Sequence, residues 1–173
     1  SVENSSIPNL AQHVDNAKVG STTGFVIPEL LKKSKVSGSL INHSEHRISS
    51  EAITQLVLKL RELKMISVVC VKDVTEAKKY VKLNPDYIAI EPPELIGSGK
   101  AVSSERPELI AKAADVIKSE KNKTKLLCGA GIVSGNDVTR ALELGSKGIL
   151  VASGIIKAKN WSKIIAEFSK AMQ

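Results

Sequence analysis

The sequence predicts an α/β domain in which parallel strands alternate with helices. Six short apolar runs recur along the 173 residues, and each is too continuous for a strand with one solvent-exposed face. Amphipathic segments with helical periodicity separate the runs, so we expect the strands to pair in parallel through right-handed crossovers. The six expected strands are NLAQH (9–13), GSLIN (38–42), ISVVCV (66–71), DYIAIE (86–91), KLLCG (125–129) and GILVA (148–152).

The segment 49–64, SSEAITQLVLKLRELK, is an expected helix. It opens on serine followed by an early glutamate, which is a typical helix start. Its apolar residues recur every three or four positions and therefore share one face, which we expect to pack on the core. These residues are Ile53, Leu56, Val57, Leu60 and Leu63.

Later helices are indicated by their ends. Asp73 with Glu76, and Ser134 with Asp137, have the spacing of a capping box, in which side chains satisfy free backbone N–H groups. Pro107 suits the first turn of another helix, because its fixed φ is helical and its missing N–H is not needed there. We therefore expect helices to begin near these three points.

Glycine and apolar spacing indicate the last two helices. Gly145 suits a helix end before the next strand, because glycine readily adopts the left-handed conformation found there. The closing segment, NWSKIIAEFSKAM, has helical periodicity. Its residues expected to face the core are Trp161, Ile164, Ile165 and Phe168.

Two α/β architectures are compatible with this pattern. Six strands can complete an open, doubly wound sheet. An eight-stranded barrel needs two more strand–helix units and roughly 200 to 250 residues in all. The strand pattern alone leaves both open.

Composition indicates one domain over residues 1–173. Hydrophobic residues make up 42% of the chain, enough to fill a single core. No apolar run approaches the roughly 20 residues of a membrane span. The N-terminus, SVENSSIPNL, does not resemble a signal peptide, so we expect no membrane association and a cytoplasmic location.

Charge and cysteine content exclude several kinds of partner. The net charge is +7, but aromatic residues make up only 3% of the chain, so nucleic-acid binding is not expected. The run KSEKNKTK (118–125) is expected to be a loop.

Cys70 and Cys128 lie in apolar runs, where a thiol behaves as a small hydrophobe, so we expect neither a disulfide nor a metal site.

Residues with useful chemistry follow four of the six expected strands. HSEHR (43–47) follows GSLIN, Glu91 follows YIAI, Gly129-Ala130-Gly131 follows KLLC, and Ala152-Ser153-Gly154 follows GILV. In both architectures, ligands bind beyond the carboxyl ends of the strands. Small residues there leave backbone N–H groups free to hold phosphate. The sequence therefore predicts a site with a carboxylate, a histidine and backbone N–H groups that bind an anion.

The stretch 91–103, EPPELIGSGKAVS, has the composition of a hinged lid. Two prolines stiffen its start, Gly-Ser-Gly provides pivots, and an apolar tip could cover a site. A carboxylate at its base, closed off from water, would become a stronger base. The lid residues after Glu91 are Pro92, Pro93, Glu94, Leu95, Ile96, Gly97, Ser98 and Gly99.

These motifs together resemble the triosephosphate isomerase family, and the Pro-Pro-Glu-Leu hinge resembles its archaeal branch. AQH with GSTTG, NHSEHR, EPPELIGSGK, LCGAG and LVASG occur in the family's order and spacing across essentially the whole chain. The resemblance implies a (βα)8 TIM barrel whose third to eighth units are present here. It also implies interconversion of dihydroxyacetone phosphate and glyceraldehyde 3-phosphate, a step of glycolysis and gluconeogenesis.

The resemblance also assigns roles to residues. Glu91 matches the catalytic base, and His43 matches the neutral electrophile that moves protons between the enediol oxygens. Backbone phosphate contacts fall on Gly97, Gly131, Ala152 and Ser153. No cofactor or metal is implied.

Two further residues match supporting positions in the family. Glu45 matches a carboxylate near the family's catalytic lysine, and Thr23 matches a loop that reaches a neighbouring subunit. The resemblance thus implies a homo-oligomer, either a dimer or the tetramer common among archaeal members.

The chain departs from the family pattern at several points. Ala130 replaces a glycine, Ala152-Ser153 replaces Gly-Gly, and Glu94 stands where many members have tryptophan. The family's opening Asn-x-Lys, with its catalytic lysine, is not found. We therefore expect the first two βα units to be missing, which would leave unpaired strand edges, an exposed interior and little activity.

Two other functions stay open at this stage. The chain could be an inactive barrel fragment that serves as an assembly or scaffold module, as the missing lysine suggests. It could instead be another phosphosugar-binding barrel enzyme, because many such barrels share glycines after the last two strands. The second alternative explains the phosphate site but neither His43 nor the lid.

Overall fold

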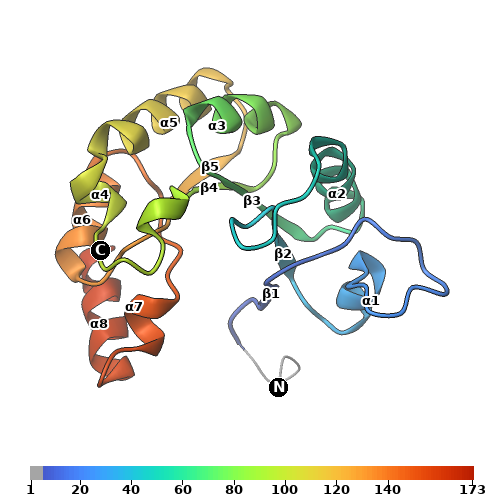
Figure 1. Cartoon of the computed structure of the whole chain (residues 1–173), viewed down its shortest axis with the longest axis horizontal. Coiled ribbons are helices and arrows are strands. Elements are labelled where there is room, and N and C mark those ends of the chain that lie inside the picture. Colours follow the sequence, from blue (N-terminus) through green and yellow to red (C-terminus); the bar gives the residue numbers. More distant parts are fainter. Residues whose placement is uncertain (1–5) are drawn as a thin grey trace.

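A computed structural model describes residues 6–173, which form an arc of parallel strands with helices along its convex side (Figure 1). The sheet has five strands in the order β1-β2-β3-β4-β5, and every pairing is parallel. The strands are β1 (Leu10–Ala11), β2 (Gly38–Ile41), β3 (Ile66–Val71), β4 (Tyr87–Ile90) and β5 (Lys125–Cys128). The expected α/β class is confirmed.

The strand order decides between the two architectures. A doubly wound sheet reverses its strand order at a switch point, whereas here each strand pairs with the next one along the chain. Successive parallel pairing that curves in one direction is the arrangement of a barrel wall. The described residues are therefore an open arc of a βα barrel.

The sixth expected strand, 148–152, is not a strand of the sheet. It joins the sheet through a single parallel bridge between Cys128 and Ile149. The backbone bonds are few: the N–H of Leu150 donates to Cys128 at 2.9 Å, and that of Cys128 donates to Gly148 at 3.0 Å. The segment follows the arc, but its pairing is too short for a regular strand.

The helices cover the outer face of the arc, and several begin where the sequence indicated. Ser49 caps the helix of the 49–64 segment, Asp73 accepts from the N–H of Glu76, and Ser134 forms a full capping box with Asp137. The elements are α1 (Pro28–Lys33), α2 (Ser50–Glu62), α3 (Val74–Tyr80), η2 (Val81–Leu83), η3 (Pro93–Leu95), α4 (Val102–Glu105), α5 (Pro107–Ser119), α6 (Gly135–Glu143), α7 (Ser153–Ile156) and α8 (Trp161–Ala171).

Two apolar clusters lie on opposite faces of the sheet. Val69 and Ile88 belong to the large cluster between the sheet and the helices. Val68, Cys70 and Ala89 belong to a smaller cluster of strand residues on the concave face. Because both faces are buried at the centre of the sheet, the strands read as continuous apolar runs. Both cysteines are buried and free, as expected.

The expected core face of α8 is wrong in two of its four positions. Phe168 is buried and Ile164 is partly buried, but Trp161 is 55% exposed and Ile165 is 50% exposed. The helix packs mainly on α6 and α7, which cover only one side of it. Helical periodicity predicts an apolar stripe, but the neighbouring elements decide how much of that stripe is buried.

Candidate active site

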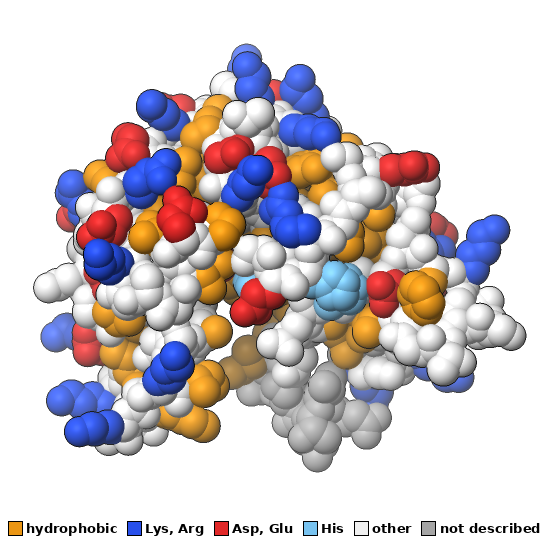
Figure 2. Space-filling model, viewed as in Figure 1, with side chains coloured by type: hydrophobic (Ala, Val, Ile, Leu, Met, Phe, Trp, Pro, Cys, Tyr) orange, Lys and Arg blue, Asp and Glu red, His pale blue; other side chains and the backbone are white. Residues whose placement is uncertain are grey.

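A cavity of about 790 Å³ opens at the carboxyl ends of the strands, on the concave side of the arc. Figure 2 shows the molecule hollowed between the α7–α8 limb and the β1–β2 side, with histidine side chains near its edge. The predicted site residues that line the cavity are His43, Glu45, Glu91, Ile96, Gly97, Gly131, Ala152 and Ser153. Thr23 is exposed on the loop after β1 and does not line it.

Glu91 lies at the floor of this cavity, immediately after β4. Its N–H continues the sheet by donating to Val71 O at 2.8 Å, and the residue is only 6% exposed. The buried Oε2 atom has no hydrogen-bond partner among the described residues. Burial raises the pKa of the carboxyl group, His43 and Cys70 partly oppose this, and Glu45 adds to it. A raised pKa makes Glu91 a stronger base than an exposed glutamate.

His43 is fixed by the loop that follows β2. The preceding residue, Asn42, is buried with φ at 66° and donates to Cys70 O at 3.0 Å. The N–H of Glu45 lies 3.4 Å from Nδ1 of His43, which therefore acts as the acceptor in this contact. Nε2 then carries the proton in a neutral ring. This atom lies 3.6 Å from Oε2 of Glu91, so the two groups face the same space.

The raised pKa of Glu91 has a consequence for folding stability. When the folded-state pKa exceeds the unfolded value, the stabilising contribution is full below the unfolded pKa and is lost as pH rises through the folded pKa. Glu91→Gln removes the buried charge, so we expect it to raise the free energy of unfolding at about pH 7 and to change it little at about pH 4. Urea unfolding of wild type and variant at the two pH values measures this. The prediction would be contradicted if the free energy of unfolding differed between the two proteins by the same amount at both pH values.

Gly129 and Cys70 both lie beside Glu91, which the sequence reasoning did not predict for either residue. A Cβ atom added at Gly129 would lie 2.3 Å from Oε1 of Glu91, so only glycine leaves room for the carboxylate. Cys70 lies on β3, and its thiol partly opposes the rise in the pKa of Glu91. Burial raises the pKa of Cys70 well above its usual value, and Glu91 raises it further, so the thiol stays protonated. The signal in the sequence for Gly129 was its position as a small residue directly after the apolar run KLLC.

The loop after β5 contacts the far end of the lid. Ala130 and Gly131 both have left-handed backbones, with φ at 69° and 72°. The N–H of Val102 donates to Ala130 O at 3.3 Å, and a Cβ at Gly131 would lie 1.8 Å from Lys100 O. Ala130 bears a strain of about 1–2 kcal/mol that glycine would not.

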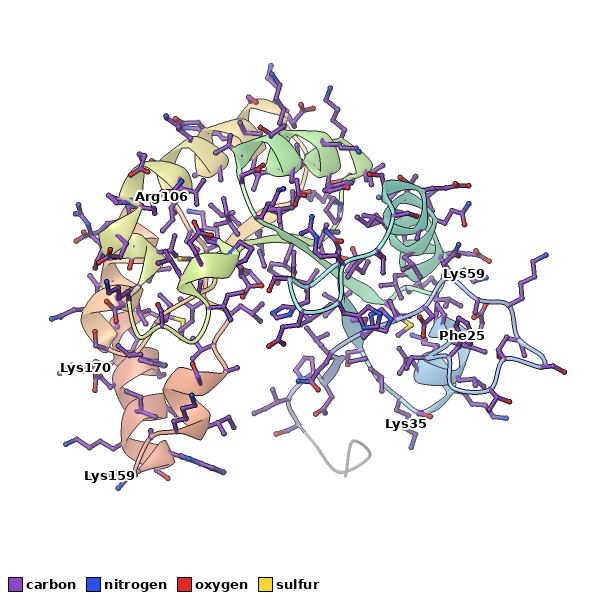
Figure 3. The ribbon with its side chains drawn as sticks, in the orientation of Figure 1. Phe25, Lys35, Lys59, Arg106, Lys159 and Lys170 are labelled. Carbon is purple, nitrogen blue, oxygen red and sulfur yellow. The ribbon has the colours of Figure 1, made fainter. Side chains whose placement is uncertain are left out.

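The lid consists of η3 and a glycine-flanked turn. Leu95 is buried in the main core, so it anchors the lid instead of forming an exposed tip, while Ile96 lines the cavity. Gly97 and Gly99 have φ at 69° and 74°, and a Cβ at either would meet no atom within 4 Å. Outside the cavity, Glu94 pairs with Arg106 at 3.1 Å (Arg106 is labelled in Figure 3). The Gly-Ser-Gly segment is thus the least packed part of the lid.

The loop after the 148–152 segment leads into α7. Ala152 has φ at −120°, an ordinary value, so replacing glycine there brings no left-handed strain. A Cβ at Gly154 would lie 2.2 Å from Ile132 O, which shows how closely this loop packs on the preceding one. Lys157, which caps α7, also lines the cavity and was not among the predicted site residues.

A pair of stacked histidines borders the cavity. The rings of His13 and His46 lie 3.7 Å apart at an interplanar angle of 12°. Nε2 of His13 lies 3.0 Å from Oδ1 of Asp15. Burial alone would raise the pKa of Asp15, but the Val26 N–H and the two histidines lower it below its usual value. The stack joins the loop bearing His43 to the base of the loop bearing Thr23.

Comparison with known proteins identifies the family of this chain. The family model for triosephosphate isomerase matches residues 1–168. The chain belongs to the triosephosphate isomerase family. Membership makes the open arc part of a TIM barrel, as the resemblance implied, and confirms the recognition made from the loop motifs.

Archaeal triosephosphate isomerases are similar along most of this chain. The protein of Cenarchaeum symbiosum is 64% identical over 163 residues, which cover 94% of this chain and 73% of that protein. Those of Methanothermus fervidus and Methanocaldococcus jannaschii are 45% and 44% identical, and each match covers 98% of this chain and 77% of the relative. The chain thus spans about three quarters of these relatives' length.

A solved structure with low sequence identity supports the fold alone. One chain of the Amycolatopsis orientalis BexX/CysO complex superposes with a TM-score of 0.63 at 17% identity, covering 83% of this chain and 57% of its own. Over residues 6–173, no helix is long and apolar enough to cross a membrane. The same residues contain no group of three or more histidine, cysteine, aspartate or glutamate side chains arranged to hold a metal ion.

Proposed function

We propose that this member of the triosephosphate isomerase family interconverts dihydroxyacetone phosphate and D-glyceraldehyde 3-phosphate. The observation that carries the proposal is the buried Glu91 carboxylate facing Nε2 of His43 at 3.6 Å across the cavity floor. An aldose–ketose isomerisation needs a base that moves a proton between adjacent carbons and an acid that moves one between adjacent oxygens. Glu91 and His43 are suited to these two tasks.

The proposed reaction moves protons without any external oxidant or cofactor. Glu91 takes a proton from C1 of dihydroxyacetone phosphate, and the C–H electron pair forms the enediolate C=C bond. The N–H of His43 donates to the developing oxyanion and exchanges protons between O1 and O2. Glu91 then returns its proton to C2, which gives the aldehyde product. Burial supports this, because a desolvated carboxylate is the stronger base.

The substrate phosphate is proposed to bind where the three loops meet. Gly97, Gly131, Ala152 and Ser153 all line the cavity, and their backbone N–H groups could serve as donors. The family's catalytic lysine lies in an Asn-x-Lys motif, and the one such triplet in residues 1–173, Asn16-Ala17-Lys18, does not bring its lysine to the cavity lining. Among the described residues, Lys157 is the lysine that lines the cavity, so it is the nearest substitute for that charge.

Oligomer formation and a cytoplasmic location are parts of the same proposal. The loop bearing Thr23 is closed at its base, where the N–H of Asp15 donates to Val26 O at 2.8 Å and that of Val26 donates to Oδ2 of Asp15 at 2.7 Å. Phe25 on this loop is 55% exposed and lies beside α1 at one end of the molecule (Figure 3). A closed loop with an exposed aromatic side chain suits insertion into a second copy.

Hydrogen exchange in D₂O tests the proposed chemistry. We expect NMR to show deuterium from solvent at C1 or C2 of the triose phosphates when the chain is present. His43→Gln should slow aldehyde formation by about 10²-fold while Glu91 still exchanges the C1 hydrogen, because the two residues handle different protons. Glu120→Gln, at an exposed position outside the cavity, is the control and should keep both rates. A folded chain that exchanges no substrate hydrogen would instead support an inactive module.

A further inference from the structure

A second pocket lies at the opposite end of the sheet from the catalytic cavity. Its volume is about 310 Å³. Its wall consists of the end of α2, the first residues of β3 and the segments that precede β4 and β5, so it opens at the amino ends of these strands. The lining residues are Arg61, Lys64, Met65, Ile66, Ser67, Asn84, Pro85, Asp86 and Lys123. No residue lines both this pocket and the catalytic cavity.

The only acidic side chain lining this pocket is already engaged. Oδ2 of Asp86 accepts from the N–H of Ser67 at 2.8 Å and from its hydroxyl at 2.9 Å. Oγ of Ser67 in turn accepts from the N–H of Asp86 at 3.0 Å. This reciprocal pair ties β3 to the start of β4 and forms a fixed polar wall. Asp86 is therefore a structural group here and forms no ion pair with the cations around it.

Three cations surround this wall. Arg61 projects from the last turn of α2, and its Nη2 donates to the carbonyl oxygens of Leu83 and Asn84, the latter at 2.9 Å. These two bonds hold the guanidinium in place, and no described residue accepts a bond from its Nε or Nη1. Lys64 and Lys123 line the same pocket, and neither forms a salt bridge with a described residue. The lining therefore carries three positive charges against one negative charge.

The backbone places Lys64 and Asn84 at the ends of helical segments. Lys64 follows the end of α2 with φ at 54°, in the left-handed region. Glycine usually occupies such a position, and a side chain there costs about 1–2 kcal/mol. Asn84, on the facing wall, has φ at 52°. Lys35 and Lys121 have the same left-handed backbone after α1 and α5, so this conformation marks helix ends in this chain and the case for a ligand rests on the pocket and its cations.

We propose that this pocket binds a small multivalent oxyanion, such as pyrophosphate or the phosphate of a metabolite larger than a triose. The fixed guanidinium supplies directional donors, and the two lysines supply mobile charge on either side. The volume is at the lower end of the range for small-molecule sites, which suits a compact anion. This pocket would be separate from the proposed binding site for the triose phosphate. The proposal does not rest on the proposed isomerase function.

Pyrophosphate titration followed by backbone NMR tests the proposal. We expect the amide signals of Ser67, Asn84 and Asp86 to shift saturably in the unmodified chain. The triple variant R61Q/K64Q/K123Q should weaken this binding by at least about tenfold, because three charge-assisted contacts are lost. The control K112Q/K163Q/K170Q changes the net charge equally at exposed positions outside the pocket and should keep the affinity.

Three outcomes would overturn the proposal. Shifts confined to Gly131 and Ser153 would place pyrophosphate in the catalytic cavity alone. Equal weakening in the two triple variants would assign the binding to net charge, not to this pocket. Unchanged binding in R61Q/K64Q/K123Q would exclude these side chains directly. A parallel titration with glucose 6-phosphate compares a phosphate ester with the inorganic anion.

Discussion

Glu91→Gln is expected to lower the isomerisation rate by about 10²- to 10⁴-fold, the range for loss of a general base. Glutamine keeps the size of the side chain but cannot accept a proton from carbon. The effect should fall on kcat, because the proposed phosphate contacts are backbone N–H groups and do not involve the Glu91 side chain. Steady-state kinetics in both reaction directions, with KM compared against wild type, measure it.

A nearby glutamate provides the matched control for this variant. Glu94 lies three residues further along the lid, is exposed, and pairs with Arg106. Glu94→Gln makes the same chemical change outside the cavity and should leave kcat within about twofold, since exposed ion pairs contribute little. Full activity in Glu91→Gln would show that Glu91 is not the base. An equal loss of kcat in both variants would show that the effect comes from a disturbed lid and not from loss of the base.

Gly129→Ala is expected to reduce kcat by about 10²-fold through displacement of the catalytic carboxylate, since a shift of about 1 Å can have that effect. The added Cβ would lie 2.3 Å from Oε1, 2.4 Å from Cγ and 2.6 Å from Cδ of Glu91. No contact this short persists, so Glu91 must move away from the floor of the cavity. Kinetics combined with the pH dependence of kcat would detect the move, because a more exposed carboxylate loses its raised pKa.

Gly148→Ala tests whether the loss is specific to the Glu91 contact. Its Cβ would meet only the tip of the Leu127 side chain, at 3.1 Å, and that side chain can give way. We expect near-normal kcat and thermal stability in this control. If Gly129→Ala retained both kcat and the pH profile of wild type, Gly129 would have no part in positioning the base.

Local features of the fold were predictable because they depend on neighbours within a few residues. The capping box of Ser134 and Asp137, the cap at Asp73 and the first-turn Pro107 are formed by groups one helical turn apart or less. Five of the six expected strands follow from continuous apolar runs. The sixth run pairs through a single bridge, because sheet length depends on the neighbouring segment as much as on composition.

The predicted site residues were found through the rule that ligands bind at the carboxyl ends of parallel strands. That rule brought His43, Glu91, Gly131 and Ser153 into one cavity without knowledge of any distance. It did not reveal the stacked His13 and His46, because neither ring is an evident ligand when read alone. It also gave no backbone angles, so the left-handed Ala130 was unexpected.

The sequence by itself determined the α/β class and most element boundaries, and its loop motifs made Glu91 and His43 the candidates for the base and the electrophile. These depend on residue type, periodicity and position after a strand. The tertiary structure decided what surrounds the base. The register that pairs Ile90 with Cys128 sets Glu91 beside Gly129, and this contact with the surrounding burial raises the carboxyl pKa. Such effects arise between segments distant in sequence, so no local pattern encodes them.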